Sequence, residues 1–167
     1  MVLGYNTYYA MPRLRDYAEA SNHEANVKPI RGDDRQRKPL GRRNQKYRHI
    51  KREEDGSIAI YDVWSRWTLR YTPNGELHIY DAVYWNKSTQ NDIIERVTGL
   101  ICFTEAGRAW INYDGGTAPI PQRAKPKWDS ERCKYEDVPP DADPAPAIFV
   151  KNERGKWAHK NPVSIMT

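Results

Sequence analysis

The fold class rests on one stretch of the sequence, Arg66-Trp67-Thr68-Leu69-Arg70-Tyr71-Thr72-Pro73-Asn74-Gly75-Glu76-Leu77-His78-Ile79-Tyr80. Its first six residues alternate between polar and apolar side chains, which places Trp67, Leu69 and Tyr71 on one face of a strand. The Pro-Asn-Gly sequence at 73–75 is typical of a turn, because proline fixes φ and glycine accepts the positive φ that closes a hairpin. Since the residues after the turn alternate in the same way, the whole stretch predicts a β-hairpin.

Further strands are predicted on both sides of this hairpin. Residues 48–52 and 57–61 have the pattern of two strands around an Asp-Gly turn. After the hairpin, residues 100–103 and 109–113 have the pattern of another strand pair across a glycine-containing turn. These segments concentrate the large apolar side chains of a chain that is only 38% hydrophobic and 29% charged. We therefore expect a small β core with a thin margin of stability.

Two short helices are predicted. Residues 12–20 begin with a proline, which suits the first turn of a helix, and they place three apolar side chains on one face. A second helix begins at a capping Ser88 or Thr89 and ends at about Thr98. Together these segments predict an α+β fold: a mostly antiparallel β-sheet core with one or two short helices, a long basic N-terminal arm and a Pro-rich C-terminal segment.

By composition the chain divides into four segments. Residues 1–46 comprise the short helix and an extended basic arm, and residues 47–116 form the β-rich core domain. Residues 117–147 hold seven of the twelve prolines and are interpreted as a stiff linker. Residues 148–167 form a C-terminal hairpin. Because a lone hairpin is marginally stable, we expect this one to add to the core sheet or to dock on another subunit.

Positive charge is concentrated in one part of the chain. The formal net charge is +5, but residues 31–52 carry ten Lys or Arg against Asp33 and Asp34. That segment has a charge of +8, and the remainder has −3. Charge of one sign resists collapse unless an anionic partner neutralises it. We therefore expect a nucleic acid or an acidic protein surface as the partner, provided that the chain's own carboxylates do not already neutralise the segment.

The basic segment has the side chains that contact a nucleic-acid backbone, namely guanidinium groups, amides and a ring that can stack. The candidate nucleic-acid-binding residues are Arg35, Arg37, Lys38, Arg42, Arg43, Lys46, Tyr47, Arg48, Lys51 and Arg52. If six of these charges each met a phosphate, affinity would fall on the order of a thousandfold between 50 and 200 mM salt. A solvated basic face, or an arm docked on acidic protein, is the alternative interpretation.

Motifs for catalysis and cofactor binding are absent from the sequence. There is no phosphate-cradling glycine loop, no Gly-x-Ser-x-Gly elbow and no His-Glu-x-x-His helix. The four histidines are scattered, and two cysteines alone cannot form a metal site. We therefore expect a protein that is not an enzyme, with no cofactor, no metal and no small-molecule substrate. Because neither a signal peptide nor an apolar run of about 18 residues is found, we also expect no export by that route and no membrane partner.

Two groups of motifs resemble a known family. The first comprises Met11-Pro12-Arg13-Leu14, Pro29-Ile30-Arg31-Gly32-Asp33 and Lys38-Pro39-Leu40-Gly41-Arg42-Arg43-Asn44-Gln45-Lys46. The second comprises Asp55-Gly56-Ser57-Ile58-Ala59-Ile60, Thr68-Leu69-Arg70-Tyr71-Thr72-Pro73-Asn74-Gly75-Glu76-Leu77 and Lys87-Ser88-Thr89. Over residues 11–113 the chain resembles small proteins of unassigned function encoded by tailed bacteriophages. The resemblance implies a phage origin. Because its motifs are structural, it implies no functional residue.

Three function classes follow from these observations. The first, which we favour, is a non-catalytic phage-encoded binding protein whose basic arm engages nucleic acid or a nucleic-acid-associated partner. The second is a minor virion component, associated with the capsid or tail, that laces neighbouring subunits and forms a homo-oligomer. The third is an inhibitor of a host defence or transcription complex. In each case we expect the protein in the host cytoplasm or in the assembled virion.

Overall fold

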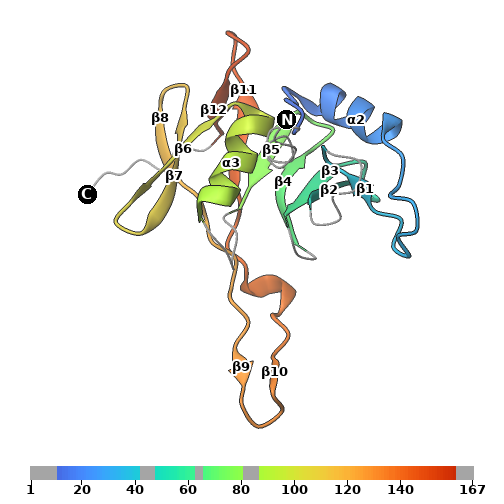
Figure 1. Ribbon diagram of the computed structural model, residues 1–167. Coiled ribbons are helices and arrows are strands. Elements are labelled where there is room, and N and C mark those ends of the chain that lie inside the picture. Colours follow the sequence, from blue (N-terminus) through green and yellow to red (C-terminus); the bar gives the residue numbers. More distant parts are fainter. Residues whose placement is uncertain (1–10, 42–47, 63–65, 81–86, 161–167) are drawn as a thin grey trace, which may run out of the picture.

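The computed structural model describes residues 11–41, 48–62, 66–80 and 87–160 (Figure 1). They form an α+β fold that is mostly antiparallel β-sheet with two short helices, which confirms the predicted fold class at this level. A seven-stranded sheet forms most of the body and a three-stranded sheet lies beside it. A two-stranded hairpin projects away from the body (Figure 1).

The seven-stranded sheet is built mainly from strands that are neighbours in the sequence. Its strands are β1 (Lys38–Pro39), β2 (Arg48–Arg52), β3 (Ile58–Asp62), β4 (Trp67–Tyr71), β5 (Glu76–Ile79), β11 (Ala147–Lys151) and β12 (Trp157–His159), in that order across the sheet. Every neighbouring pair is antiparallel. β4 and β5 are the hairpin predicted over 66–80, and Gly75 in its turn has the expected positive φ, 92°. β2 and β3 are the strands predicted around the Asp-Gly turn.

The C-terminal hairpin adds to this sheet. β11 pairs with β5, and β12 pairs with β11. Phe149 of β11 is fully buried, and Trp157 of β12 is only 5% exposed. Of the two placements expected for this hairpin, the structure therefore shows addition to the core sheet.

The remaining strands form two smaller units. The three-stranded sheet consists of β6 (Ile101–Glu105), β7 (Arg108–Tyr113) and β8 (Gly116–Pro119). The projecting hairpin consists of β9 (Trp128–Asp129) and β10 (Lys134–Tyr135), and a short 3-10 helix, η1 (Pro140–Ala142), follows it. We call residues 127–136 the finger. The finger and η1 both lie in the segment that its prolines had suggested to be a linker.

The first helix, α2 (Tyr17–Asn26), begins later than the predicted range of 12–20. Asp16 explains the later start, because its carboxylate accepts the Glu19 backbone N–H at 2.9 Å and so caps the helix. The residues before Asp16 have another hydrogen-bond partner. The Leu14 N–H donates to a backbone carbonyl near the end of the second helix, at 2.8 Å.

One hydrophobic core lies against the inner face of the seven-stranded sheet. The second helix, α3 (Lys87–Thr98), lies close to its predicted range and contributes Ile93 and Ile94, which are fully buried. Leu14 and Leu40 belong to the same core as the strand residues. Residues on both sides of the expected boundary at residue 46 therefore share one core. The side chains that alternate with the buried ones lie on the outer face of the sheet.

Candidate nucleic-acid interface

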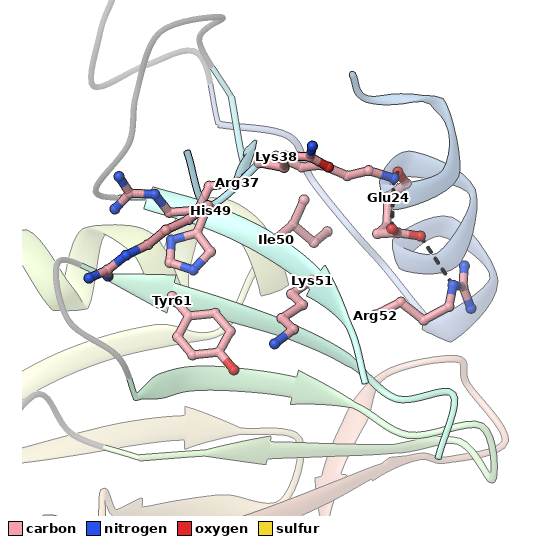
Figure 2. Close-up of a pocket in the computed structure, with 10 residues that line it drawn as sticks. Glu24, Arg37, Lys38, His49, Ile50, Lys51, Arg52 and Tyr61 are labelled. Atoms are coloured by element: carbon pink, nitrogen blue, oxygen red, sulfur yellow. Dashed lines mark hydrogen bonds and ion pairs between the residues drawn. The ribbon is translucent and has the colours of Figure 1, made fainter. Parts of the chain in front are cut away.

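Part of the predicted basic segment lines a single hollow on the surface. The hollow has a volume of about 760 Å³ and lies where β1 and β2 meet the end of α2 (Figure 2). We call it the basic groove. Its lining residues are Glu24, Arg35, Gln36, Arg37, Lys38, His49, Ile50, Lys51, Arg52 and Tyr61. The sequence-based candidates among them are Arg35, Arg37, Lys38, Lys51 and Arg52.

A compact turn before β1 brings the two halves of the groove together. The Ile30 N–H donates to the Arg37 carbonyl at 2.9 Å and closes the turn. β1 then pairs with β2, with Lys38 opposite Ile50. Because β1 is only two residues long and pairs with His49 and Ile50, the last two residues of β2, Lys51 and Arg52, form the edge of the sheet. The basic residues before β1 and those of β2 therefore meet at this edge.

The turn itself neutralises one groove cation. The Arg37 guanidinium contacts both carboxylate oxygens of Asp33, with Nε 2.9 Å from Oδ2 and Nη2 3.1 Å from Oδ1. The Arg37 backbone N–H donates to the same carboxylate at 2.9 Å. These hydrogen bonds lower the pKa of Asp33, so its carboxylate stays ionised at neutral pH. Two-point contacts of this kind fix the guanidinium in both position and orientation.

Two more groove cations share a single carboxylate on α2. Lys38 Nζ lies 2.8 Å from Glu24 Oε1, and Arg52 Nε lies 3.1 Å from Glu24 Oε2 (Figure 2). Burial raises the pKa of Glu24, but the hydrogen bonds and charges of Lys38 and Arg52 outweigh burial and lower it. Glu24 is only 8% exposed. This three-residue network therefore ties α2 to the edge of the sheet, and its two cations and one carboxylate leave a net charge of +1.

Two groove cations direct their charge to solvent. Arg35 and Lys51 are both exposed, and neither forms an ion pair with a carboxylate in the described ranges. Lys51 lies on β2, two residues beyond His49 and therefore on the same face of the sheet. These two side chains add two positive charges that no carboxylate among the described residues pairs with.

Two aromatic rings stand beside these charges. His49 of β2 and Tyr61 of β3 are direct cross-strand partners, and their rings are parallel, with centroids 4.5 Å apart and planes 3° from each other (Figure 2). Burial raises the pKa of the Tyr61 hydroxyl, which therefore stays neutral at physiological pH. Both side chains are half-buried and both line the groove. We call them the ring pair.

The ring pair belongs to a longer aromatic row on the outer face. Tyr61 lies opposite Trp67 of β4, whose ring centroid is 5.1 Å from that of Tyr80. The Arg123 guanidinium covers this second part of the row, 4.6 Å from the Trp67 ring and 4.0 Å from the Tyr80 ring. Asp143 holds Arg123 in place at 2.7 Å. One end of the row is therefore occupied by the protein's own cation, whereas the other end lies in the groove.

The other sequence-based candidates are placed differently. Arg48 is buried, at 6% exposure, with its guanidinium 3.6 Å from the sulfur of Met11, and it does not line the groove. Four further candidates lie outside the described residues: Arg42, Arg43, Lys46 and Tyr47.

The groove residues that were missed are Glu24, Gln36, His49, Ile50 and Tyr61. The signal for the ring pair was in the sequence, because pairing two strands about the predicted Asp-Gly turn places His49 opposite Tyr61. No comparable signal pointed to Glu24, whose contact with Lys38 and Arg52 depends on how α2 packs.

Other chemistries find little support in the described part of the chain. No group of three His, Cys, Asp or Glu side chains there could hold a metal ion. Among the same residues, no helix is long and apolar enough to cross a membrane. No protein-family model matches the chain, and no curated protein or solved structure shows significant similarity to it. What the groove offers chemically is positive charge beside flat aromatic rings.

Proposed function

We propose that the protein is a non-catalytic binding protein whose basic groove engages the phosphate backbone of a nucleic acid. The observation that carries the proposal is that Arg35 and Lys51 are both exposed and both line one groove. Lysine and arginine side chains held at a surface without internal partners are the groups that displace counterions from phosphates. An acidic protein surface is the competing partner class.

The internal ion pairs change the expected strength of binding. Arg37, Lys38 and Arg52 are paired with carboxylates, and Arg48 is buried. Arg35 and Lys51 have no carboxylate partner among the described residues, and the candidates Arg42, Arg43 and Lys46 lie outside those residues. If each of these five cations met a phosphate, affinity for duplex DNA would fall about 500-fold between 50 and 200 mM salt. This fall is smaller than the one expected from the sequence alone.

The test is a salt titration of a fluorescently labelled 15-base-pair DNA duplex, read by fluorescence anisotropy. For the double variant Arg35→Ala/Lys51→Ala, we expect the slope of log affinity against log salt to fall by about 1.8, since each phosphate contact contributes about 0.9. The matched control is Lys127→Ala/Lys134→Ala, which removes two exposed cations of the finger and should leave the slope unchanged. Salt-insensitive binding by the wild type, or an equal loss in the control, would contradict the proposal.

A second candidate function, a virion component of a tailed phage, is favoured by the finger. Trp128 and Tyr135 lie on a hairpin that projects from the body (Figure 1) and are 55% and 59% exposed. Their rings contact each other edge to face, with centroids 5.0 Å apart. Exposed aromatic pairs of this kind are common where one protein anchors on another. If this candidate is right, mass spectrometry of purified particles should detect the chain in stoichiometric amounts.

A further inference from the structure

We propose that the basic groove takes single-stranded nucleic acid and that an unpaired base stacks on the ring pair. This inference rests on the proposed function, because it names the class of nucleic acid that the same groove prefers. Backbone contacts alone do not distinguish single strands from duplexes, since both carry phosphates. The distinction has to come from a part of the groove that contacts bases.

The ring pair has the geometry that such a contact needs. His49 and Tyr61 come from adjacent strands of a rigid sheet, and they already stack on each other with planes only 3° apart. Base-on-ring stacking tolerates any base, because every base has a π face. In a duplex the bases are stacked within the helix, so a flat protein ring cannot reach their faces. The ring pair therefore contributes to the binding of unpaired bases and adds nothing for a duplex.

At its other end, the aromatic row already holds one planar cation. The Arg123 guanidinium lies 4.0 Å from the Tyr80 ring centroid and 4.6 Å from the Trp67 ring centroid. Two contacts hold it there: Asp143 at 2.7 Å and the Trp67 carbonyl at 2.8 Å. Because this end is already occupied and only His49 and Tyr61 of the row line the groove, the proposed base contact is assigned to the ring pair.

The exposed cations are placed to meet the phosphates next to a stacked base. Lys51 follows His49 by two residues on β2, so it lies on the same face at a distance of about 7 Å along the strand. Arg35 lines the same groove from the turn before β1. Aromatic rings beside a charged track are the common arrangement of proteins that bind single strands without reading their sequence. We therefore expect weak sequence preference.

The experiment compares three probes on the full chain: a labelled 15-nucleotide oligothymidine, a 15-base-pair DNA duplex, and a heparin oligosaccharide, which has charge but no bases. Tyr61→Leu keeps an apolar side chain on β3 and removes the ring, whereas Tyr61→Phe keeps the ring. We expect Tyr61→Leu to weaken oligothymidine binding about tenfold, since loss of one stacked base has this magnitude. Duplex and heparin binding should not change, and Tyr61→Phe should bind all three probes as the wild type does.

The matched control is Tyr135→Leu, which removes an exposed tyrosine of the finger outside the groove and should have no effect on any probe. Thermal melts followed by circular dichroism verify that each variant is folded. If Tyr61→Leu does not fold, the same comparison is made with His49→Leu, which removes the other ring. Salt-dependent binding of all three probes without dependence on either ring would overturn this inference and leave the proposed function standing. Absence of salt-dependent binding to any probe would overturn both.

Discussion

At Glu24, a single carboxylate contacts Lys38 at 2.8 Å and Arg52 at 3.1 Å. The same two cations line the groove that we propose to bind phosphates. A phosphate and Glu24 therefore compete for them, because a cation held by one anion attracts a second anion less strongly. Glu24 therefore stabilises the fold and lowers the affinity of the groove for a polyanion.

Substitution of Glu24 by glutamine should consequently have two opposite effects. Losing an ionised partner of two partly exposed cations should lower the free energy of unfolding by about 1–3 kcal/mol, measured by urea denaturation. Because one negative charge is removed from beside Lys38 and Arg52, DNA binding should strengthen and its salt dependence should steepen by up to about 0.9 in slope. The control Glu131→Gln removes an exposed finger carboxylate and should change neither quantity. Weaker DNA binding by Glu24→Gln would contradict the placement of the site.

The stability of this region should also depend on pH in a defined direction. The folded protein lowers the pKa of Glu24 from 4.5 and that of Asp33 from 3.8. The stability that these carboxylates contribute is fully present above those ordinary values and is lost as pH falls through the lower folded values. The urea midpoint should therefore be steady from pH 7 to about pH 5 and should drop in more acidic solution. Glu24→Gln should show a smaller acid-induced drop than the wild type.

At the scale of secondary-structure elements, β1 and the turn before it belong to the folded body. Leu40 directly follows β1 and is fully buried, and its N–H donates to the Arg48 carbonyl at 2.9 Å. Ile30 at the start of the turn is 7% exposed. A basic segment that packs in this way is positioned before any ligand arrives, so binding does not have to supply all of its ordering entropy.

Leu40→Ala tests whether this segment stabilises the core. We expect it to lower the free energy of unfolding by about 2–5 kcal/mol, as truncation of a fully buried leucine does, measured by urea denaturation. Arg35→Ala lies in the same segment but is exposed, and it should change stability by less than about 0.5 kcal/mol. If both variants were as stable as the wild type, the segment would be an independent arm, as its composition alone had suggested.

How well the sequence predicted each element depended on the range of the interactions that form it. The β4–β5 hairpin was predictable because strict alternation and a Pro-Asn-Gly turn are local signals. α2 was displaced because Asp16 caps the helix while Leu14 bonds to the end of α3, which is a tertiary contact. β9 and β10 were missed because two-residue strands have no measurable periodicity and the nearby prolines suggested a linker.

The site was also predictable only in part, because some of its interactions are local in the sequence and others depend on tertiary packing. Arg35 and Lys51 follow from the local concentration of charge, and the ring pair follows from strand register. The pairing of Lys38 and Arg52 with Glu24 could not be read from the sequence, because it joins residues 14 and 28 positions apart through the packing of α2. Counting basic residues therefore overestimated the free charge of the groove.

On the scale of the whole molecule, the finger and the C-terminal hairpin relate to the body in opposite ways. The finger exposes Trp128 and Tyr135 and is anchored only near its base, where Arg123 and Arg66 contact Asp143. β11 and β12 instead extend the main sheet and bury Phe149 completely. The fold should tolerate loss of the first and not of the second.

Replacement of residues 128–135 by Asn-Gly tests this contrast. The Glu136 N–H already donates to the Lys127 carbonyl at 2.8 Å, so a two-residue turn closes the shortened finger without disturbing its base. We expect stability within about 0.5 kcal/mol of the wild type and unchanged salt-dependent DNA binding.

A chain ending at residue 146 should instead aggregate or stay unfolded, because it lacks Phe149 and leaves β5 as an open edge. Size-exclusion chromatography and circular dichroism measure both outcomes. Loss of DNA binding in the shortened-finger variant would move the nucleic-acid site from the groove to the finger, whereas loss of self-association alone would assign the finger to subunit contacts and leave the groove as the binding site.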